Sequence, residues 1–100
     1  MPAAARINDN CTTGHPCTPI IGIKGNLQSK VYINGTLAAV IGDVLKDHTI
    51  LVGNSCVPHP ATVTGGSSKV FYQGMAAARI GDAADFGAII QGSSNTFAGG

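Results

Sequence analysis

The sequence of 100 residues contains no tryptophan and no glutamate, and only 5% of its residues are aromatic. Hydrophobic residues make up 44% of the chain, but thirteen of them are alanine, so side chains large enough to fill a broad core are scarce. A thin core in a chain of this size often needs a covalent or metal cross-link. We therefore expect one small cross-linked domain that spans residues 1–100.

Charge and long apolar runs are also scarce. The formal net charge is +1, charged residues make up 11% of the chain, and the basic ones do not cluster. Nucleic-acid binding requires a dense basic surface, so we expect no nucleic-acid partner. No run approaches the roughly 20 apolar residues that span a bilayer. The opening MPAAARINDN lacks the apolar centre of a signal peptide, so we expect synthesis in the cytoplasm without one.

Repetition is the most prominent feature that the sequence does have. The phrase Ala-Ala-Ala-Arg-Ile-x-Asp occurs at residues 3–9 and again at residues 76–82. Between them, residues 35–43 read GTLAAVIGD, which is the same phrase with Val40 in place of arginine. Internal repeats of this kind indicate a fold built from one supersecondary unit used several times.

The repeated unit is longer than this phrase and is typical of a β-hairpin. Residues 29–43 and 68–82 align over fifteen positions without a gap, and each contains a turn dipeptide, Asn34-Gly35 or Gln73-Gly74. The alanine runs are short and lack helix caps, so we expect strands in which alanine permits close packing.

The two ends of the chain hold complementary halves of the same unit. The N-terminal copy has only the second half, and residues 94–99 repeat only the first half. We therefore expect the first and last strands to pair with each other.

All histidines and cysteines lie in two inserts between the repeats, CTTGHPC at residues 11–17 and HTILVGNSCVPH at residues 48–59. Imidazole and thiolate are preferred zinc ligands, and structural zinc sites use four of them. Cys56 and His59 have the spacing of a chelating pair, His15 lies in a turn, and Asp47 is expected to orient the ring of His48.

The cysteines admit several readings. Cys11 and Cys17 are separated by five residues, which permits a disulfide, but three cysteines leave one unpaired and nothing indicates an oxidising compartment. Free thiols are favoured, or one of these two cysteines replaces Cys56 as a ligand. The third insert, residues 83–91, contains no soft ligand, so the metal is expected to use the first two inserts only.

Taken together, PAAARIND, NGTLAAVIGD, QGMAAARIGD, the starts GSSKVF and GSSNTF, and CTTGHPC resemble the PAAR-repeat family, in particular its short phage-like members. The resemblance covers the whole chain and implies an all-β fold. In this family, repeated β-hairpins form a small cone with pseudo-threefold symmetry, and zinc held by three histidines and one cysteine staples it near the vertex. The matching ligands here are His15, His48, Cys56 and His59.

The resemblance implies a structural protein rather than an enzyme. Such a protein caps and sharpens the trimeric β-helical spike of a type VI secretion system or a contractile phage tail, with one copy per trimer, and aids membrane piercing. It would act first in the cytoplasm and then at the tip of the secreted spike or virion tail, in transient contact with the target membrane, and it can carry effector cargo. Val40 departs from the family phrase and leaves a shared role for Arg6 and Arg79 open.

Two other functions remain at this point. A free-standing β adaptor would attach effector cargo to the spike. A small zinc hydrolase would need an open coordination position and usually a carboxylate base, and the absence of glutamate counts against it. The sequence does not distinguish a phage tail from a secretion apparatus, and it specifies the metal only as zinc in preference to iron.

Overall fold

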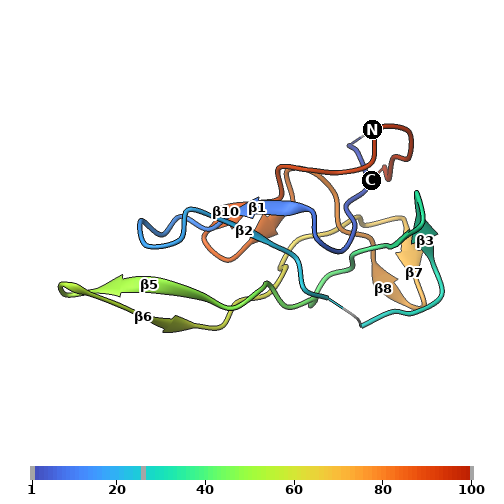
Figure 1. Ribbon diagram of the computed structural model, residues 1–100. Coiled ribbons are helices and arrows are strands. Elements are labelled where there is room, and N and C mark those ends of the chain that lie inside the picture. The colour runs from blue at the N-terminus through green and yellow to red at the C-terminus, as the bar shows by residue number, and fades with distance from the viewer. Residues whose placement is uncertain (1, 26, 100) are drawn as a thin grey trace.

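The protein folds into short antiparallel strands joined by tight turns (Figure 1). The computed structural model describes residues 2–25 and 27–99, and within these residues no helix occurs that could span a membrane. The strands are β1 (Asn10–Thr12), β2 (Ile20–Gly22), β3 (Tyr32–Ile33), β4 (Thr36–Leu37), β5 (His48–Val52), β6 (Ser55–His59), β7 (Phe71–Tyr72), β8 (Met75–Ala76), β9 (Ala83–Ala84) and β10 (Gly87–Ala88). The predicted all-β class is confirmed.

Within the described residues the strands pair as five two-stranded antiparallel hairpins, including the two that the repeat predicts. β3 pairs with β4 around Asn34-Gly35, and β7 pairs with β8 around Gln73-Gly74. Both residues of each turn have positive φ, at 54° and 78° in the first and 51° and 81° in the second. This is the pattern of the type I′ turn, whose twist matches that of the flanking strands.

The two ends of the chain form a further pairing, as expected from their complementary halves. Ala3 bridges Phe97 in antiparallel fashion, and the Ala4 N–H donates to the Thr96 carbonyl at 2.9 Å. The Ala98 N–H donates to the Pro2 carbonyl at 3.0 Å. Figure 1 shows both termini at the same end of the molecule.

The three alanine-rich phrases meet in the centre through a closed ring of hydrogen bonds. The Ala5 N–H donates to the Ala78 carbonyl (2.9 Å), Ala78 to Ala39 (3.0 Å) and Ala39 to Ala5 (3.0 Å). All three residues are fully buried. Three backbones that approach this closely leave room for little more than a methyl group, which accounts for the repeated alanine.

The core surrounding this ring is thin, and no aromatic side chain is among its buried members in the described part of the chain. Its buried members are Ala5, Cys11, Ile23, Ala39, Leu45, Val63, Ala78, Ala84 and Ile89. Cys11 is a free thiol, and burial, together with the charge of Asp9, raises its pKa to about 11. The alternative disulfide between Cys11 and Cys17 is wrong, because Cys17 is bonded to Cys56 instead.

Beyond the core, the β5–β6 hairpin projects away from the end that holds the termini (Figure 1). The five residue pairs of this hairpin run from His48 opposite His59 to Val52 opposite Ser55. The protein measures 41 × 23 × 22 Å along its principal axes. The insert with the longest strands thus forms one end of an elongated molecule.

Candidate metal centre

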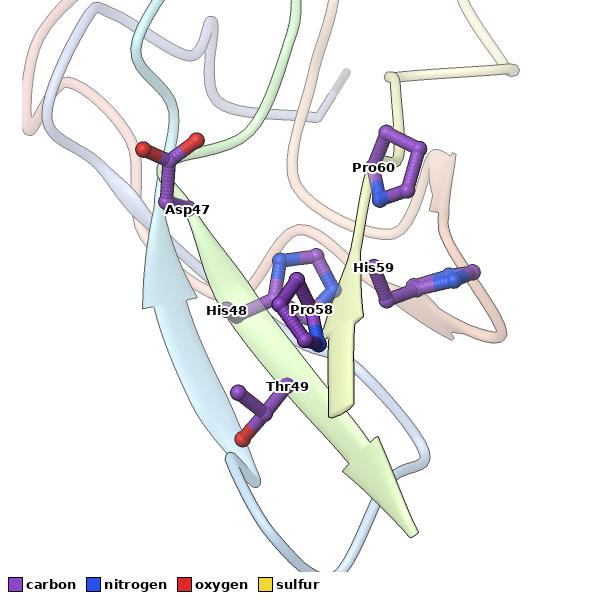
Figure 2. Close-up of a pocket in the computed structure, with 6 residues that line it drawn as sticks. All are labelled: Asp47, His48, Thr49, Pro58, His59 and Pro60. Carbon is purple, nitrogen blue, oxygen red and sulfur yellow. The ribbon is translucent and has the colours of Figure 1, made fainter. Parts of the chain in front are cut away.

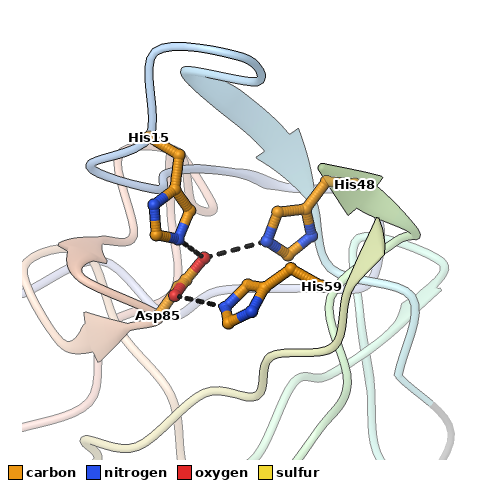
Figure 3. A group of neighbouring side chains, drawn as sticks. All are labelled: His15, His48, His59 and Asp85. Atoms are coloured by element: carbon orange, nitrogen blue, oxygen red, sulfur yellow. Dashed lines mark hydrogen bonds and ion pairs between the residues drawn. The ribbon is translucent and has the colours of Figure 1, made fainter. Parts of the chain in front are cut away.

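Three inserts from distant parts of the sequence bring four side chains together (Figure 3). His15 lies in the loop between β1 and β2. His48 begins β5 and His59 ends β6, and the two face each other in the hairpin register. Asp85 begins the two-residue turn between β9 and β10 and has a φ of 55°. Each insert therefore contributes at least one polar group to a single cluster.

The three imidazoles surround the carboxylate of Asp85. The Nε2 atoms of His15 and His48 each lie 2.9 Å from Asp85 Oδ2, and His59 Nε2 lies 3.2 Å from Oδ1. One potential ligand atom from each residue lies within 4.8 Å of all the others. Ligands held about 2.0–2.1 Å from a tetrahedral zinc ion lie about 3.3 Å apart, so the four groups have the spacing of a metal site.

The cluster is withdrawn from solvent. The side chains of His48 and Asp85 are 1% and 3% exposed, and that of His59 is 24% exposed. Burial alone would raise the pKa of the Asp85 carboxyl, but interactions with His48, His15 and His59 outweigh it and hold the pKa below its usual value. Asp85 is therefore present as a carboxylate, the form that binds a cation.

Hydrogen bonding within the cluster is incomplete without a cation. His48 Nδ1 lies 3.0 Å from the Lys46 carbonyl oxygen, which only accepts, so the Nδ1–H is the donor. His48 Nε2, 2.9 Å from Asp85 Oδ2, can therefore donate to the carboxylate only when the ring is protonated, and in the neutral ring it offers the lone pair that binds a metal. His15 Nε2 is buried and, despite its short distance to Asp85, makes no properly directed hydrogen bond. A metal ion between these groups would satisfy all of these lone pairs, so the residues fit the metal.

Three of the four predicted ligands, His15, His48 and His59, are brought together, but Cys56 is not among them. Its sulfur is bonded to that of Cys17, so the predictions of Cys56 as a ligand and of a free thiol at Cys17 are wrong, whereas Cys11 is a free thiol as expected. Neither Cys11 nor Cys17 replaces Cys56 in the cluster. Cys56 and His59 do not form the predicted chelating pair because they belong to one continuous strand, β6. Residues three apart in a strand point to opposite faces, whereas a chelating pair requires a turn.

Asp85 takes the place expected for a thiolate, and the expectation that the third insert plays no part is wrong. The third insert has no imidazole or thiol, but carboxylate oxygen also binds zinc. A usable signal was present, because Asp85 and Asp47 are the two aspartates outside the repeated phrase. Asp47 does not orient His48, whose Nδ1 instead contacts the Lys46 carbonyl.

A cavity of about 470 Å³ lies beside the cluster (Figure 2). It is lined by Asp47, His48, Thr49, Pro58, His59 and Pro60. In Figure 2 the carboxylate of Asp47, the acidic residue of this lining, points away from both imidazole rings. The cavity gives ions and water a route to His59, but its lining places no carboxylate base next to the cluster.

No family model matches the sequence, and no curated protein matches it either. The four-residue cluster could hold a metal ion, and it is the feature of the described residues with the clearest chemical use.

Proposed function

We propose that the protein is a structural spike tip, one copy of which caps the trimeric β-helical spike of a contractile injection machine, either a type VI secretion system or a phage tail. The observation that carries this proposal is the cyclic pairing of the three repeated phrases. A monomer that fits the end of a trimer must present a similar surface in three directions. One hairpin phrase, repeated around an axis, would provide this surface.

The cyclic pairing extends beyond the alanine ring. Equivalent residues two positions further along donate to equivalent carbonyls: Ile7 to Leu37, Ile41 to Ala76 and Ile80 to Ala3, each at 2.9 Å. In this outer set the first phrase donates to the second, the second to the third and the third to the first, which is the opposite sense to the alanine ring. We infer a pseudo-threefold axis through the buried alanines, around which the chain would form a cone.

Three equivalent aromatic residues support a docking surface at the end that holds the termini. Tyr32, Phe71 and Phe97 occupy the same position in the three units and are 60%, 54% and 50% exposed. Large apolar side chains exposed at related positions are typical of an interaction site. Tyr32 and Phe71 begin the short strands β3 and β7, and Phe97 pairs with Ala3. The strands of a trimer could add to these segments by backbone hydrogen bonding.

At the opposite end from the docking surface, a bound metal would stabilise the cone. A metal held by His15, His48, His59 and Asp85 would cross-link the three inserts, and structural zinc contributes on the order of 10 kcal/mol to folding. Zinc is favoured because imidazole and carboxylate both bind it. Four protein ligands close the coordination shell, so we infer a structural and not a catalytic metal.

The projecting β5–β6 hairpin would lead during membrane piercing. Leu51 and Val52, near its turn, are apolar and 49% and 55% exposed. Under this proposal the protein assembles on the spike in the cytoplasm and meets the target membrane transiently through this hairpin. Effector cargo would travel with the same complex.

The test is to mix the purified protein with a trimeric β-helical spike protein encoded beside it and to follow co-elution. Phe71→Asp should abolish co-elution because it places a charge in the apolar docking surface. Phe86→Asp is the matched control, because Phe86 is 78% exposed but lies in the third insert beside the metal cluster. Equal loss with both variants, or no co-elution of the unaltered protein, would contradict the proposal.

A further inference from the structure

Few non-covalent links, and none between two backbone groups of the described residues, connect residues 47–60 of the β5–β6 hairpin to the rest of the protein. The last backbone contact to another segment is the Lys46 N–H, which donates to the Gly22 carbonyl at 2.9 Å. Across the described part of the chain, no hydrogen bond between backbone groups joins residues 47–60 to a different segment. The position of this hairpin therefore depends on a few side-chain links.

Two of these links reach the loop between β1 and β2. The hydroxyls of Thr18 and Thr49 lie 3.2 Å apart, and the Thr49 N–H also donates to Thr18 Oγ1 at 3.3 Å. Cys17 and Cys56 form the disulfide. The third link is the histidine cluster around Asp85. The same loop carries His15, so it holds the hairpin on one side and a metal ligand on the other.

The disulfide and the metal would connect the same two short segments. Cys17 follows His15 by two residues, and Cys56 precedes His59 by three. A metal bound to both histidines would close a small ring through residues 15–17 and 56–59. When one of two neighbouring cross-links exists, most of the entropy cost of closing the second is already met. The two links must therefore affect each other's stability.

We propose that the Cys17–Cys56 disulfide is a reversible latch that controls the metal affinity of the site formed by His15, His48, His59 and Asp85. With the latch closed, the loop holds His15 opposite the hairpin and the metal binds tightly. With the latch open, the hairpin and loop separate more easily and the metal binds more weakly. This inference rests on the metal-binding role proposed above but not on the spike partner.

The cysteines are placed for exchange with small thiols. Cys56 is exposed and Cys17 is half-buried, whereas Cys11 is fully buried. To close the latch, the Cys56 thiolate attacks a low-molecular-weight disulfide and releases one thiol. The Cys17 thiolate then attacks the Cys56 sulfur of this mixed disulfide and releases the second thiol. Two electrons pass from the protein to the small disulfide, which becomes two thiols.

The latch would respond to the compartment. Cytosolic thiols keep cysteines reduced, whereas the periplasm and the cell exterior favour disulfides. A protein that is assembled in the cytosol and then expelled would carry an open latch first and a closed one later. The protein would therefore bind its metal more tightly after it has left the cytosol.

The first test compares zinc affinity by competition with a chelating dye. The oxidised protein, the protein reduced with a phosphine and the Cys17→Ser/Cys56→Ser double variant are titrated in parallel. Reduction and double substitution should each weaken zinc binding about 5–150-fold, the usual range of coupling between two sites. The Cys11→Ala variant, which keeps both latch cysteines, should show the same loss on reduction.

Unchanged affinity on reduction would overturn the proposal, and so would tighter binding. Tighter binding would mean that a freed thiolate replaces Asp85 as a ligand, which cobalt substitution detects as an intense thiolate-to-metal charge-transfer band. Both outcomes are independent of capping, so a failure here is distinguishable from a failure of the spike-tip proposal.

The reciprocal test measures the same coupling between zinc and the disulfide in the unaltered protein, so it remains valid even if the double variant fails to fold. Coupling between two equilibria acts equally in both directions. Saturating zinc should therefore shift the disulfide equilibrium in a glutathione series toward the disulfide by the factor by which reduction weakens zinc binding. The disulfide fraction is measured by alkylation and mass spectrometry. A midpoint of the thiol–disulfide equilibrium that is the same with and without zinc would contradict the proposed latch.

Discussion

Arg79 binds Asp82 through two parallel contacts, Nε to Oδ2 and Nη2 to Oδ1, both at 2.9 Å. Arg6 makes the same pair with Asp9 at 3.0 Å. In all three phrases the aspartate Oδ2 also accepts the backbone N–H three residues earlier, at 2.8 Å. The aspartate thus forms the turn, and the arginine adds to it.

The middle phrase shows how the turn forms without arginine. Val40 donates its backbone N–H to Asp43 Oδ2, and the Leu27 N–H donates to Asp43 Oδ1 at 3.1 Å. A backbone donor thus replaces the missing guanidinium. Arg6 and Arg79 do share a role, and Val40 marks the copy in which another segment supplies it.

Arg79→Val is therefore expected to cost about 1–2 kcal/mol, because the Arg79 side chain is only 12% exposed and also donates to the carbonyls of Gly66 and Gly99. Asp82→Ala should cost about 2–3 kcal/mol because it also leaves the Arg79 N–H without its acceptor. Urea unfolding of both variants measures the difference. An Arg79→Val cost equal to that of Asp82→Ala would show that the ion pair, not the turn, carries the stability.

Metal removal should destabilise the fold strongly. Free zinc at 1,000 times its dissociation constant stabilises the native state by about 4 kcal/mol. For a domain of this size, that corresponds to a rise of roughly 15–30 °C in Tm. Calorimetry of chelated and zinc-loaded protein checks this, and identical melting temperatures would exclude a structural metal.

Asp85→Asn isolates the charge of the fourth ligand. Asparagine tolerates the positive φ of this turn as well as aspartate does, so the backbone should be unaffected. Zinc affinity should fall at least about tenfold, the loss that follows removal of even an outer-shell partner. Asp47→Asn, beside His48 but pointing away from it, should leave the affinity unchanged. Equal affinities in both variants would remove Asp85 from the site.

The zinc-loaded protein is expected to have no peptidase, nuclease or esterase activity. Four protein ligands leave no position for an activated water, and the cavity beside His59 offers no carboxylate base directed at the cluster. Turnover assays with generic substrates test this. Activity that disappears in His59→Ala would restore the hydrolase alternative.

Much of the fold follows from local patterns. The turn dipeptides at Asn34 and Gln73 predict their hairpins because positive φ is a local requirement. The complementary half-units predict the pairing of Ala3 with Phe97 because each half lacks its partner strand. The grouping of the three histidines follows from their confinement to two inserts.

The rest of the site depends on contacts between distant residues. Asp85 joins the histidines only because the third insert turns toward them, and its position outside the repeated phrase, which Asp47 shares, does not tell the two aspartates apart. The Cys17–Cys56 pairing depends on the β5–β6 hairpin lying beside the loop that holds Cys17, a contact that cysteine spacing does not reveal. Strand alternation was the local rule that could have excluded Cys56 as a partner ligand of His59.

The three equivalent aromatics should contribute similarly to capping. Single aspartate substitutions at Tyr32, Phe71 and Phe97 are each expected to weaken spike binding by a similar factor, because each would meet one subunit of a symmetric partner. Titration calorimetry of the three variants tests this. Complete dependence on one aromatic, with no effect of the other two, would contradict a threefold match.

The most direct test of the spike-tip account is the stoichiometry of the complex with the trimeric spike, measured by native mass spectrometry. The cyclic pairing of the phrases predicts one copy of this protein on three copies of the spike, with one metal ion per complex. Three copies of this protein per spike trimer would contradict the account, because each subunit would then bind its own copy and the repeat would serve no symmetry match.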